Sequence, residues 1–252
     1  DKPAAPPEGA TLVSDKNIVI TDAITKAQGL TNDGEYFYFS GKTTLTKMAL
    51  DGETTVIKKV AAIPVELTSK YNSNHLGGLS YYNGKIYAAL EDNQFYKHPL
   101  IAVYDAETLE YTGEFFEVSN QSHMAWCAVN PEDGLIYTSD WSNATQLNVY
   151  SVDGFEYVKT IELSAPIDRV QGAEFYKGTL YLSSDVKNDT KPILAIDVST
   201  GVVSTAFNTN LGKGFEAEDV TILPMDDGSL FHIIAAGKSR LNIHFSHYSI
   251  DE

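Results

Sequence analysis

A glycine followed three residues later by an aromatic side chain recurs five times along this chain of 252 residues. Successive glycines are separated by 50, 50, 44 and 50 residues in a chain that is only 11% aromatic. A fixed offset in every copy therefore indicates an internal repeat. The five pairs are Gly34 and Phe37, Gly84 and Tyr87, Gly134 and Tyr137, Gly178 and Tyr181, and Gly228 and Phe231.

The second copy, over residues 74–118, shows the repeating unit in full. Asn83-Gly84 is a strong signal for a two-residue hairpin, because both positions must adopt a positive φ. Apolar and β-branched runs flank this turn, and two further strand-like runs follow it. Four strands repeated every ~40–50 residues are typical of propeller blades. The sequence therefore predicts an all-β fold, a five-bladed β-propeller of four-stranded blades.

The two ends of the chain are expected to meet in the last blade. The fifth unit lacks a clear fourth strand, whereas a strand-like run at 17–21 precedes the first unit. We expect this N-terminal strand to close the ring, because closure leaves no open sheet edge. Residues 1–10 are rich in proline and predict a flexible leader, and residues 11–252 are expected to form a single propeller domain.

Composition limits the classes of partner. The net charge of −16, from 18 basic and 34 acidic residues, disfavours nucleic acids and anionic membranes. No apolar run is long enough to predict a transmembrane segment. The single cysteine, Cys127, excludes an intramolecular disulfide and reads as a small buried hydrophobe. The start at Asp1 suggests a processed chain. We expect a monomer that is secreted, periplasmic or tethered as a lipoprotein outside the cytoplasm.

Chain direction predicts a ligand site at one mouth of the propeller axis. The first strand of each unit should be innermost, because small residues such as Gly29, Gly77 and Gly172 occur where backbones crowd. Each hairpin returns the end of the second strand to the face where the first strand starts. Convergent polar groups are typical of a ligand pocket, although they also satisfy strand ends or hold channel water. The residues expected to project into this cavity are Gln28, His75, Glu91, His123, Trp126, Gln171, Glu174, Glu218 and Lys238.

A metal site is an alternative for part of this mouth. His75 and His123 start neighbouring inner strands, and with Glu91 or Asp140 they are candidate ligands for Zn²⁺ or Ca²⁺. The acidic run 216–219 is either a second Ca²⁺ candidate or a solvated acidic rim. No other cofactor is indicated, since no phosphate-binding or nucleophile-elbow motif occurs.

Two side-chain types at the mouth leave alternatives open. Trp126 and Trp141 either form an apolar wall against which a ligand ring stacks, or pack in the core between blades. Glu174, if buried, needs a partner, and Lys238 or Arg169 are the candidates.

Several short motifs at the strand starts resemble those of the glutamine cyclotransferase family, five-bladed propellers that cyclise N-terminal glutamine. The motifs are Ala27-Gln28-Gly29-Leu30, Gly77-Gly78-Leu79, Ala125-Trp126-Cys127-Ala128, Gln171-Gly172-Ala173-Glu174-Phe175 and Gly237-Lys238. The resemblance covers about residues 25–250. In that family the inner strands begin with patterns such as QGL, EGL, WGL and NELE, and a GK follows in the last blade.

Position by position, the resemblance carries over to four residues: Gln28, Trp126, Glu174 and Lys238. Gly77 stands where the family has its acidic general acid/base, and Gln171 stands where it has the asparagine of NELE. Ser184 or Asp185 replaces a family tryptophan. Loss of a general acid/base lowers a rate by about 10²–10⁴. The resemblance implies the architecture and a pocket in the same place, and the same reaction only if His75 or Glu91 substitutes.

The leading functional prediction is a propeller that binds a small molecule or peptide at its axial mouth. The alternative is a propeller enzyme, either a glutamine cyclotransferase-like acyl transferase or a metal-assisted hydrolase or lactonase. A third class, the protein-interaction propeller, would need an exposed apolar patch. The fold does not decide among these classes.

Overall fold

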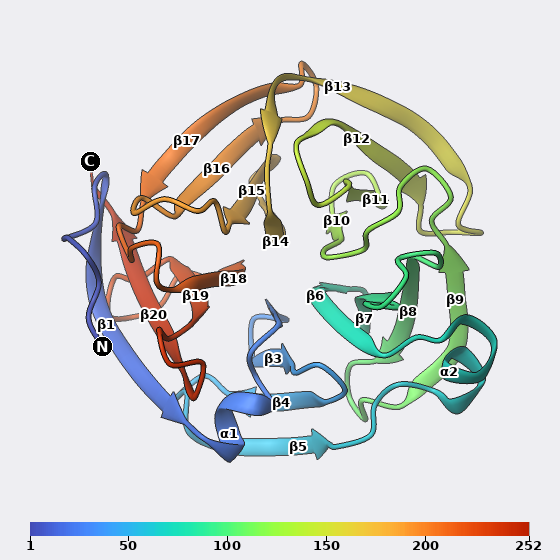
Figure 1. The fold of residues 1–252 in the computed structure, drawn as a ribbon, viewed down its shortest axis with the longest axis horizontal. Coiled ribbons are helices and arrows are strands. Elements are labelled where there is room, and N and C mark those ends of the chain that lie inside the picture. Colours follow the sequence, from blue (N-terminus) through green and yellow to red (C-terminus); the bar gives the residue numbers. More distant parts are fainter. Residues whose placement is uncertain (252) are drawn as a thin grey trace.

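Five antiparallel sheets of four strands surround a central axis, as Figure 1 shows for the computed structural model, which describes residues 1–251. The prediction of a five-bladed all-β propeller is confirmed. Blade 1 contains β2 (Gly29–Asn32), β3 (Tyr36–Ser40), β4 (Leu45–Ala49) and β5 (Thr55–Lys59). Blade 2 contains β6 (His75–Tyr82), β7 (Lys85–Glu91), β8 (Leu100–Asp105) and β9 (Tyr111–Glu117).

The other three blades repeat this order from the axis outward. Blade 3 contains β10 (Ala128–Asn130), β11 (Leu135–Thr138), β12 (Ala144–Ser151) and β13 (Tyr157–Ile167). Blade 4 contains β14 (Val170–Tyr176), β15 (Thr179–Ser184), β16 (Pro192–Asp197) and β17 (Val202–Asn208). Blade 5 contains β18 (Glu216–Ile222), β19 (Phe231–Ala236), β20 (Asn242–Ile250) and β1 (Ala10–Val19). Two short helices, α1 (Thr21–Ile24) and α2 (Val65–Tyr71), lie in the links that precede blades 1 and 2.

An N-terminal strand closes the ring, as predicted. Strand β1 pairs antiparallel with β20 along its whole length, from Ala10 opposite Ile250 to Val19 opposite Asn242. The strand begins earlier than the predicted run 17–21, and it ends at Val19, where the positive φ of Ile20 (52°) departs from extended backbone. Figure 1 shows both chain ends at the outer edge of blade 5, apart from each other along that edge.

The first nine residues lie along blades 4 and 5. The backbone N–H of Ala4 donates to the carbonyl of Asn210 at 3.1 Å, and Glu8 forms an isolated β-bridge with Asn208. These contacts attach the segment to the propeller before β1 begins.

The repeated glycines form the inner hairpin turns. Asn83 and Gly84 have φ values of 47° and 76°, and Tyr82 pairs with Lys85 across them, which is a two-residue turn of the predicted kind. The other four repeat glycines also have positive φ, from 67° to 90°. The aromatic residue three positions later lies in the second strand of each blade, where it packs into the core clusters.

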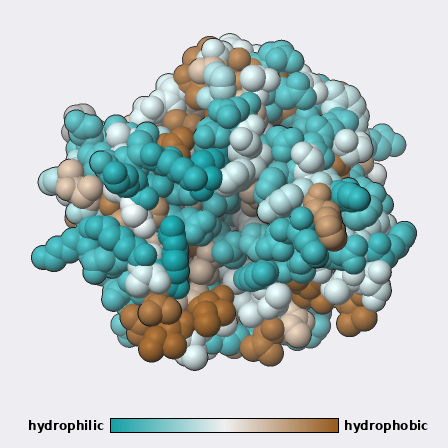
Figure 2. All heavy atoms as spheres, viewed as in Figure 1, coloured by the Kyte–Doolittle hydropathy of each residue, from teal (hydrophilic) through white to brown (hydrophobic). Residues whose placement is uncertain are grey.

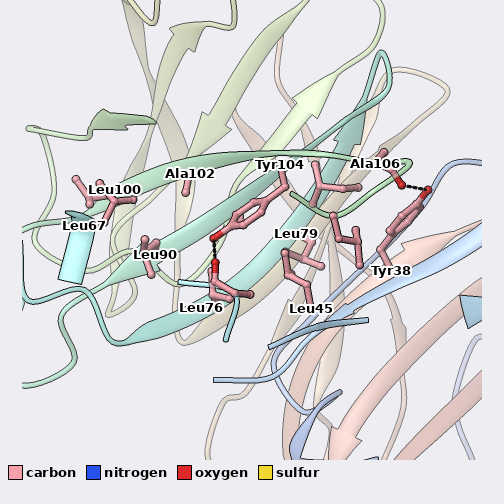
Figure 3. Packing of buried hydrophobic residues seen from close by; sticks show 14 of the residues in the cluster. Tyr38, Leu45, Leu67, Leu76, Leu79, Leu90, Leu100, Ala102, Tyr104 and Ala106 are labelled. Carbon is pink, nitrogen blue, oxygen red and sulfur yellow. Dashed lines mark hydrogen bonds between the residues drawn. The ribbon is translucent and has the colours of Figure 1, made fainter. Parts of the chain in front are cut away.

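The hydrophobic core lies between neighbouring blades. Between blades 1 and 2, Leu45, Leu79 and Tyr38 are at most 1% exposed (Figure 3). Two tyrosine hydroxyls in this layer donate to backbone carbonyls: Tyr38 to Ala106 at 3.1 Å and Tyr104 to Ala62 at 2.8 Å. The buried tyrosines therefore satisfy their polar ends.

The innermost strands approach one another so closely that side chains do not fit. A Cβ on Gly29 would lie 2.3 Å from the carbonyl oxygen of Gly77, and a Cβ on Gly77 would lie 2.4 Å from that of Ala125. Blade 3 has a shorter inner strand than its sequence suggests. Residues 124–127 come before β10 and contact blade 2. For example, the backbone N–H of Gly78 donates to the carbonyl of Ala125 at 2.8 Å.

The face in Figure 2 is largely hydrophilic, and apolar side chains gather at its lower left, where α1 meets blade 5. Ile20, Ile24 and Leu241 are each at least 65% exposed there. Within residues 1–251, none of the helices combines the length and the apolar character that a membrane crossing requires.

Candidate functional site

One end of the propeller axis opens into a cavity of about 240 Å³. Its wall combines carboxylate, amide, imidazole and aromatic groups with two small residues. The lining residues are Gln28, His75, Gly77, Glu91, Asn93, Tyr96, His123, Ala125, Trp141, Gln171, Glu216 and Glu218. All five blades, or the links that enter them, contribute to this wall.

Six of the nine residues expected in this cavity line it, and three do not. Those present are Gln28, His75, Glu91, His123, Gln171 and Glu218. The hairpin argument explains their meeting, because His75 at the start of β6 pairs directly with Glu91 at the end of β7.

Trp126 was expected in the cavity, but its side chain packs between blades. It is fully buried, and its indole N–H donates to the hydroxyl of Ser139 at 3.1 Å. Its neighbours include Leu147 and Val170 of a core cluster. Ala125, one position earlier, lines the cavity. Adjacent residues of extended chain face opposite sides, so Trp126 belongs to the core.

Glu174 was also expected at the mouth, but it lies deeper on the axis. Its carboxylate accepts hydrogen bonds from the hydroxyls of Thr31 at 3.2 Å and Thr221 at 2.7 Å, and from the N–H of Ile222. Neither Lys238 nor Arg169 is its partner. Burial raises the pKa of Glu174 to about 7 despite these hydrogen bonds.

Lys238 was the third residue expected in the cavity, and it lines a different one. Strand β19 ends at Ala236, so the chain has already turned outward at Lys238. The ammonium lies 5.4 Å from the ring centre of Phe215, and the backbone N–H donates to the carboxylate of Asp1 at 2.8 Å. The prediction assumed that the second strand of blade 5 extends to Lys238 at the cavity, and this assumption is wrong.

Glu91 is the centre of the polar wall. It is 3% exposed, and its Oε2 accepts the backbone N–H of Met124 at 2.7 Å. The Nδ1 of His123 lies 2.9 Å from Oε2, and the Nδ1 of His75 lies 3.7 Å from Oε1. The Nδ1 atoms of His75 and His123 are both buried, and neither makes a well-directed hydrogen bond within residues 1–251. Burial lowers the pKa of His75, so its imidazole is uncharged at neutral pH.

The candidate metal ligands do not assemble into an ion site. Asp140 uses Oδ1 to accept the backbone N–H groups of His123 at 3.1 Å and Trp141 at 3.2 Å, which orients the loop. Residues 1–251 contain no group of three histidine, cysteine or acidic side chains placed to share one ion. The geometry therefore gives no support to the Zn²⁺ or Ca²⁺ hypothesis.

A stack of planar side chains forms one side of the cavity. The ring centres of Tyr96 and His123 are 4.0 Å apart, and those of His123 and Trp141 are 5.3 Å apart, with interplanar angles of 30° and 27°. The guanidinium of Arg169 lies 4.3 Å from the Trp141 ring and extends the stack. The Trp141 indole N–H donates to the amide oxygen of Gln171 at 3.2 Å, and the amide NH₂ of Gln171 makes no hydrogen bond to any residue from 1 to 251.

The loop after β7 supplies Tyr96, which the strand argument missed. Asp92 accepts the backbone N–H groups of Phe95 at 2.6 Å, Tyr96 at 3.0 Å and Lys97 at 2.9 Å. Tyr96 takes a left-handed conformation with φ 51°, an unusual one for an aromatic residue. The aspartate that begins this aromatic loop is a capping signal that could have identified it.

Glu218 differs from the other acidic residues of the wall. It is 4% exposed, and its carboxyl makes no hydrogen bond or ion pair to any residue from 1 to 251. Burial, followed by the charges of Glu216 and Asp185, raises the pKa of Glu218 well above its usual range. Glu216, by contrast, is partly exposed and lies 3.3 Å from Arg240.

Many solved structures are similar to the chain, among them the three that follow. Myxococcus xanthus glutaminyl cyclase superposes with a TM-score of 0.66 at 16% identity, over 98% of this chain and 100% of that one. Kuenenia stuttgartiensis hydrazine synthase gives 0.48 at 14% identity, over 86% and 57%. A chain of the mitotic checkpoint complex gives 0.46 at 10% identity, over 88% and 73%. At 16% identity the likeness to the cyclase shows the fold alone.

Sequence comparison places the chain in a family. Comparison with curated proteins finds no match. A family model described as "Repeat of unknown function (DUF6923)" matches residues 25–217, which is more than half of the chain. The chain therefore belongs to the DUF6923 repeat family.

Proposed function

We propose that this propeller binds a small ligand in its axial cavity. One observation carries the proposal. Polar side chains from different blades meet in the cavity with donors or acceptors that form no hydrogen bond within residues 1–251. The amide oxygen of Gln171 accepts from Trp141, and its NH₂ has no partner within residues 1–251. The amide nitrogen of Gln28 donates to Ala27 at 2.9 Å, and its oxygen accepts no bond from the described residues. The carboxyl of Glu218, which is 4% exposed, likewise makes no hydrogen bond in this part of the chain.

The size of the cavity limits the ligand. A volume of about 240 Å³ is below the ~300–1,000 Å³ of typical drug-sized sites. A fragment-sized molecule, or the end of a peptide, fits this space.

Trp141 provides a direct readout for the test. The chain has two tryptophans, of which Trp126 is fully buried in the core and Trp141 lines the cavity. Small amines, amides, alcohols and carboxylates would be titrated while tryptophan emission and melting temperature are followed. A ligand of the cavity should change the emission of Trp141 and raise the melting temperature, since it binds only the native state.

Two variants control this experiment. Trp141→Phe should remove the emission change. Ala125→Leu, which adds bulk at the cavity wall, should weaken binding, whereas Val158→Leu on the exposed outer strand β13 should not. Binding that is indifferent to both cavity variants would contradict the proposal.

A second candidate is an acyl-transfer enzyme, because His123 and Glu91 are within hydrogen-bond reach at 2.9 Å. Catalytic hydrogen bonds are often poorly aligned before substrate binds. The glutaminyl cyclase of the same fold suggests the reaction to assay: attack of an N-terminal glutamine's amine on its side-chain amide carbon, with release of ammonia.

The assay measures ammonia released from a peptide that begins with glutamine. Activity should fall by about 10²-fold or more in Glu91→Gln, and the exposed Glu35→Gln should leave it unchanged. No release above the uncatalysed rate would remove this candidate. We further propose an extracytoplasmic location and a monomeric state, which cell fractionation and sedimentation test.

A further inference from the structure

We infer that the ligand of the axial cavity is a small organic cation, a protonated amine whose ammonium group lies against the carboxyl of Glu218. The inference rests on the proposed function and names the chemical class that this site selects.

The charges of the wall favour a cation. Three of the lining side chains are acidic, namely Glu91, Glu216 and Glu218, and none of those from residues 1–251 is lysine or arginine. Of the nearby guanidiniums, Arg169 pairs with Asp185 at 2.8 Å, and Arg240 pairs with one of the three lining acids, Glu216, at 3.3 Å. Within residues 1–251, Glu218 has no ion-pair partner of its own.

Glu218 identifies the position of the cationic group. Glu218 is only 4% exposed, and the part that remains accessible lines the cavity. Its carboxyl makes no hydrogen bond within residues 1–251, so the cavity is where a partner for it can lie. Gln28 lines the same cavity, and its amide oxygen, which accepts no hydrogen bond from residues 1–251, offers a second acceptor for an ammonium N–H.

The spacing of the acidic groups favours an organic cation over a metal ion. The part of the chain that the structure describes has no three ligating groups close enough to share one ion. The carboxyls are instead distributed around a space of about 240 Å³. A flat hydrocarbon part beside the Tyr96, His123 and Trp141 stack would bury apolar surface.

Binding should be coupled to a proton. The charged and titratable groups that face Glu218 are Glu216 and Asp219 on its own strand, Asp185 after β15, Arg240 after β19, and His75 and Glu91 across the cavity. In the free protein, burial and then the charges of Glu216 and Asp185 raise the pKa of Glu218. An ammonium ion at the carboxyl favours its ionised form and lowers this pKa, so binding is coupled to proton release and becomes tighter as pH rises.

The test compares three probes of the same shape: benzylammonium chloride, benzyl alcohol and sodium benzoate. Each would be titrated calorimetrically into the full chain at pH 6, 7 and 8, in phosphate and in MOPS, a zwitterion that carries no net positive charge, unlike an amine buffer. We expect benzylammonium to bind at least tenfold more tightly than the alcohol, more tightly at higher pH, and with a heat that differs between buffers. Glu218→Gln should remove the buffer difference and weaken binding at least tenfold. Glu35→Gln, which removes the same charge from an exposed turn, should change neither.

Two results would overturn the inference. If benzyl alcohol or benzoate binds as tightly as benzylammonium, and Ala125→Leu weakens that binding, the cavity is a ligand site but does not select cations. If benzylammonium does not bind to the wild-type protein at millimolar concentration, or if Glu218→Gln binds it equally well, the assigned ammonium position is wrong. The broad titration with Trp141 emission then decides separately whether the cavity binds any small ligand.

Discussion

Gly172 in blade 4 lies directly beneath the carboxylate of Asp219 in blade 5, so close that a Cβ on Gly172 would lie 1.7 Å from Oδ1. The other oxygen of Asp219 accepts the backbone N–H groups of Leu30 at 2.8 Å and Leu79 at 3.1 Å. One side chain thereby joins the inner strands of blades 1, 2 and 5, and glycine at 172 provides the space for it.

Gly172→Ala should be among the most destabilising single substitutions in this protein. The new methyl group collides with a carboxylate that three blades hold in place, and overpacking of this severity costs about 3 kcal/mol or more in the free energy of unfolding. Gly113→Ala is the control. Gly113 has φ 89°, but an added Cβ would meet open space, so this substitution should cost only about 1–2 kcal/mol through backbone strain. Urea denaturation of both variants compares the two costs, and equal losses would contradict the steric argument.

Asp219→Asn should destabilise the fold without a change in side-chain size. Burial raises the pKa of Asp219, whereas the N–H groups of Leu30, Leu79 and Val220 favour its carboxylate. An amide has one accepting oxygen, so at least one of these buried N–H groups would face another donor. The expected loss is about 1–3 kcal/mol. The exposed Asp153→Asn is the matched control in the same denaturation experiment. A stability equal to that of the control would show that the three hydrogen bonds do not hold the axis together.

Glu174 should make stability depend on pH. Its folded pKa of about 7 lies above its ordinary value of 4.5, so the native state holds the proton more tightly than the unfolded state does. The contribution of this group is therefore fully present below about pH 4.5 and is lost as pH rises through 7, by a few kcal/mol at most. Glu174→Gln should remove this part of the pH dependence between pH 5 and 8 in thermal melts. Parallel curves for the two proteins would contradict the assignment.

Deletion of β1 should open the ring. Residues 10–19 pair with β20 along its whole length and cover Ile243 and Phe245, which are at most 1% exposed. Loss of residues 1–19 should lower the melting temperature by about 10 °C or more, since it exposes a sheet edge and part of a core cluster. Deletion of residues 1–9 alone is the control, and it should cost much less. If the two deletion variants have the same melting temperature, β1 does not stabilise blade 5.

The repeat was predictable from the sequence because each inner hairpin turn needs a residue with positive φ. Glycine adopts this conformation most readily, so Gly84 and its four equivalents recur at regular intervals in the sequence. The placement of His75 opposite Glu91 was equally predictable, because antiparallel pairing fixes it. These parts of the site depend only on chain direction within one blade.

The rest of the site depends on contacts between blades, which the sequence pattern does not contain. Trp126 faces the core because the segment before β10 bonds to blade 2 and sets which side each residue faces. Lys238 leaves the axis because β19 ends two residues before it. The close approach of Asp219 to Gly172 joins residues of different blades, so no local rule predicts it.

Asp92→Ala should release the loop that carries Tyr96 while leaving the propeller folded. Burial works to raise the pKa of Asp92, but the N–H groups of Lys97, Phe95 and Tyr96 outweigh it and lower the pKa, which shows how strongly they engage the carboxylate. Loss of that acceptor removes three hydrogen bonds that offset the strained φ of Tyr96. Phe95 is 57% exposed, so chymotrypsin can cleave here once the loop opens. Cleavage should accelerate tenfold or more, with little change in melting temperature. Asn93→Ala is the control in the same loop, because its side chain makes no hydrogen bond within residues 1–251. An unchanged cleavage rate in Asp92→Ala would mean that the loop is held by the stacking of Tyr96 on His123 instead.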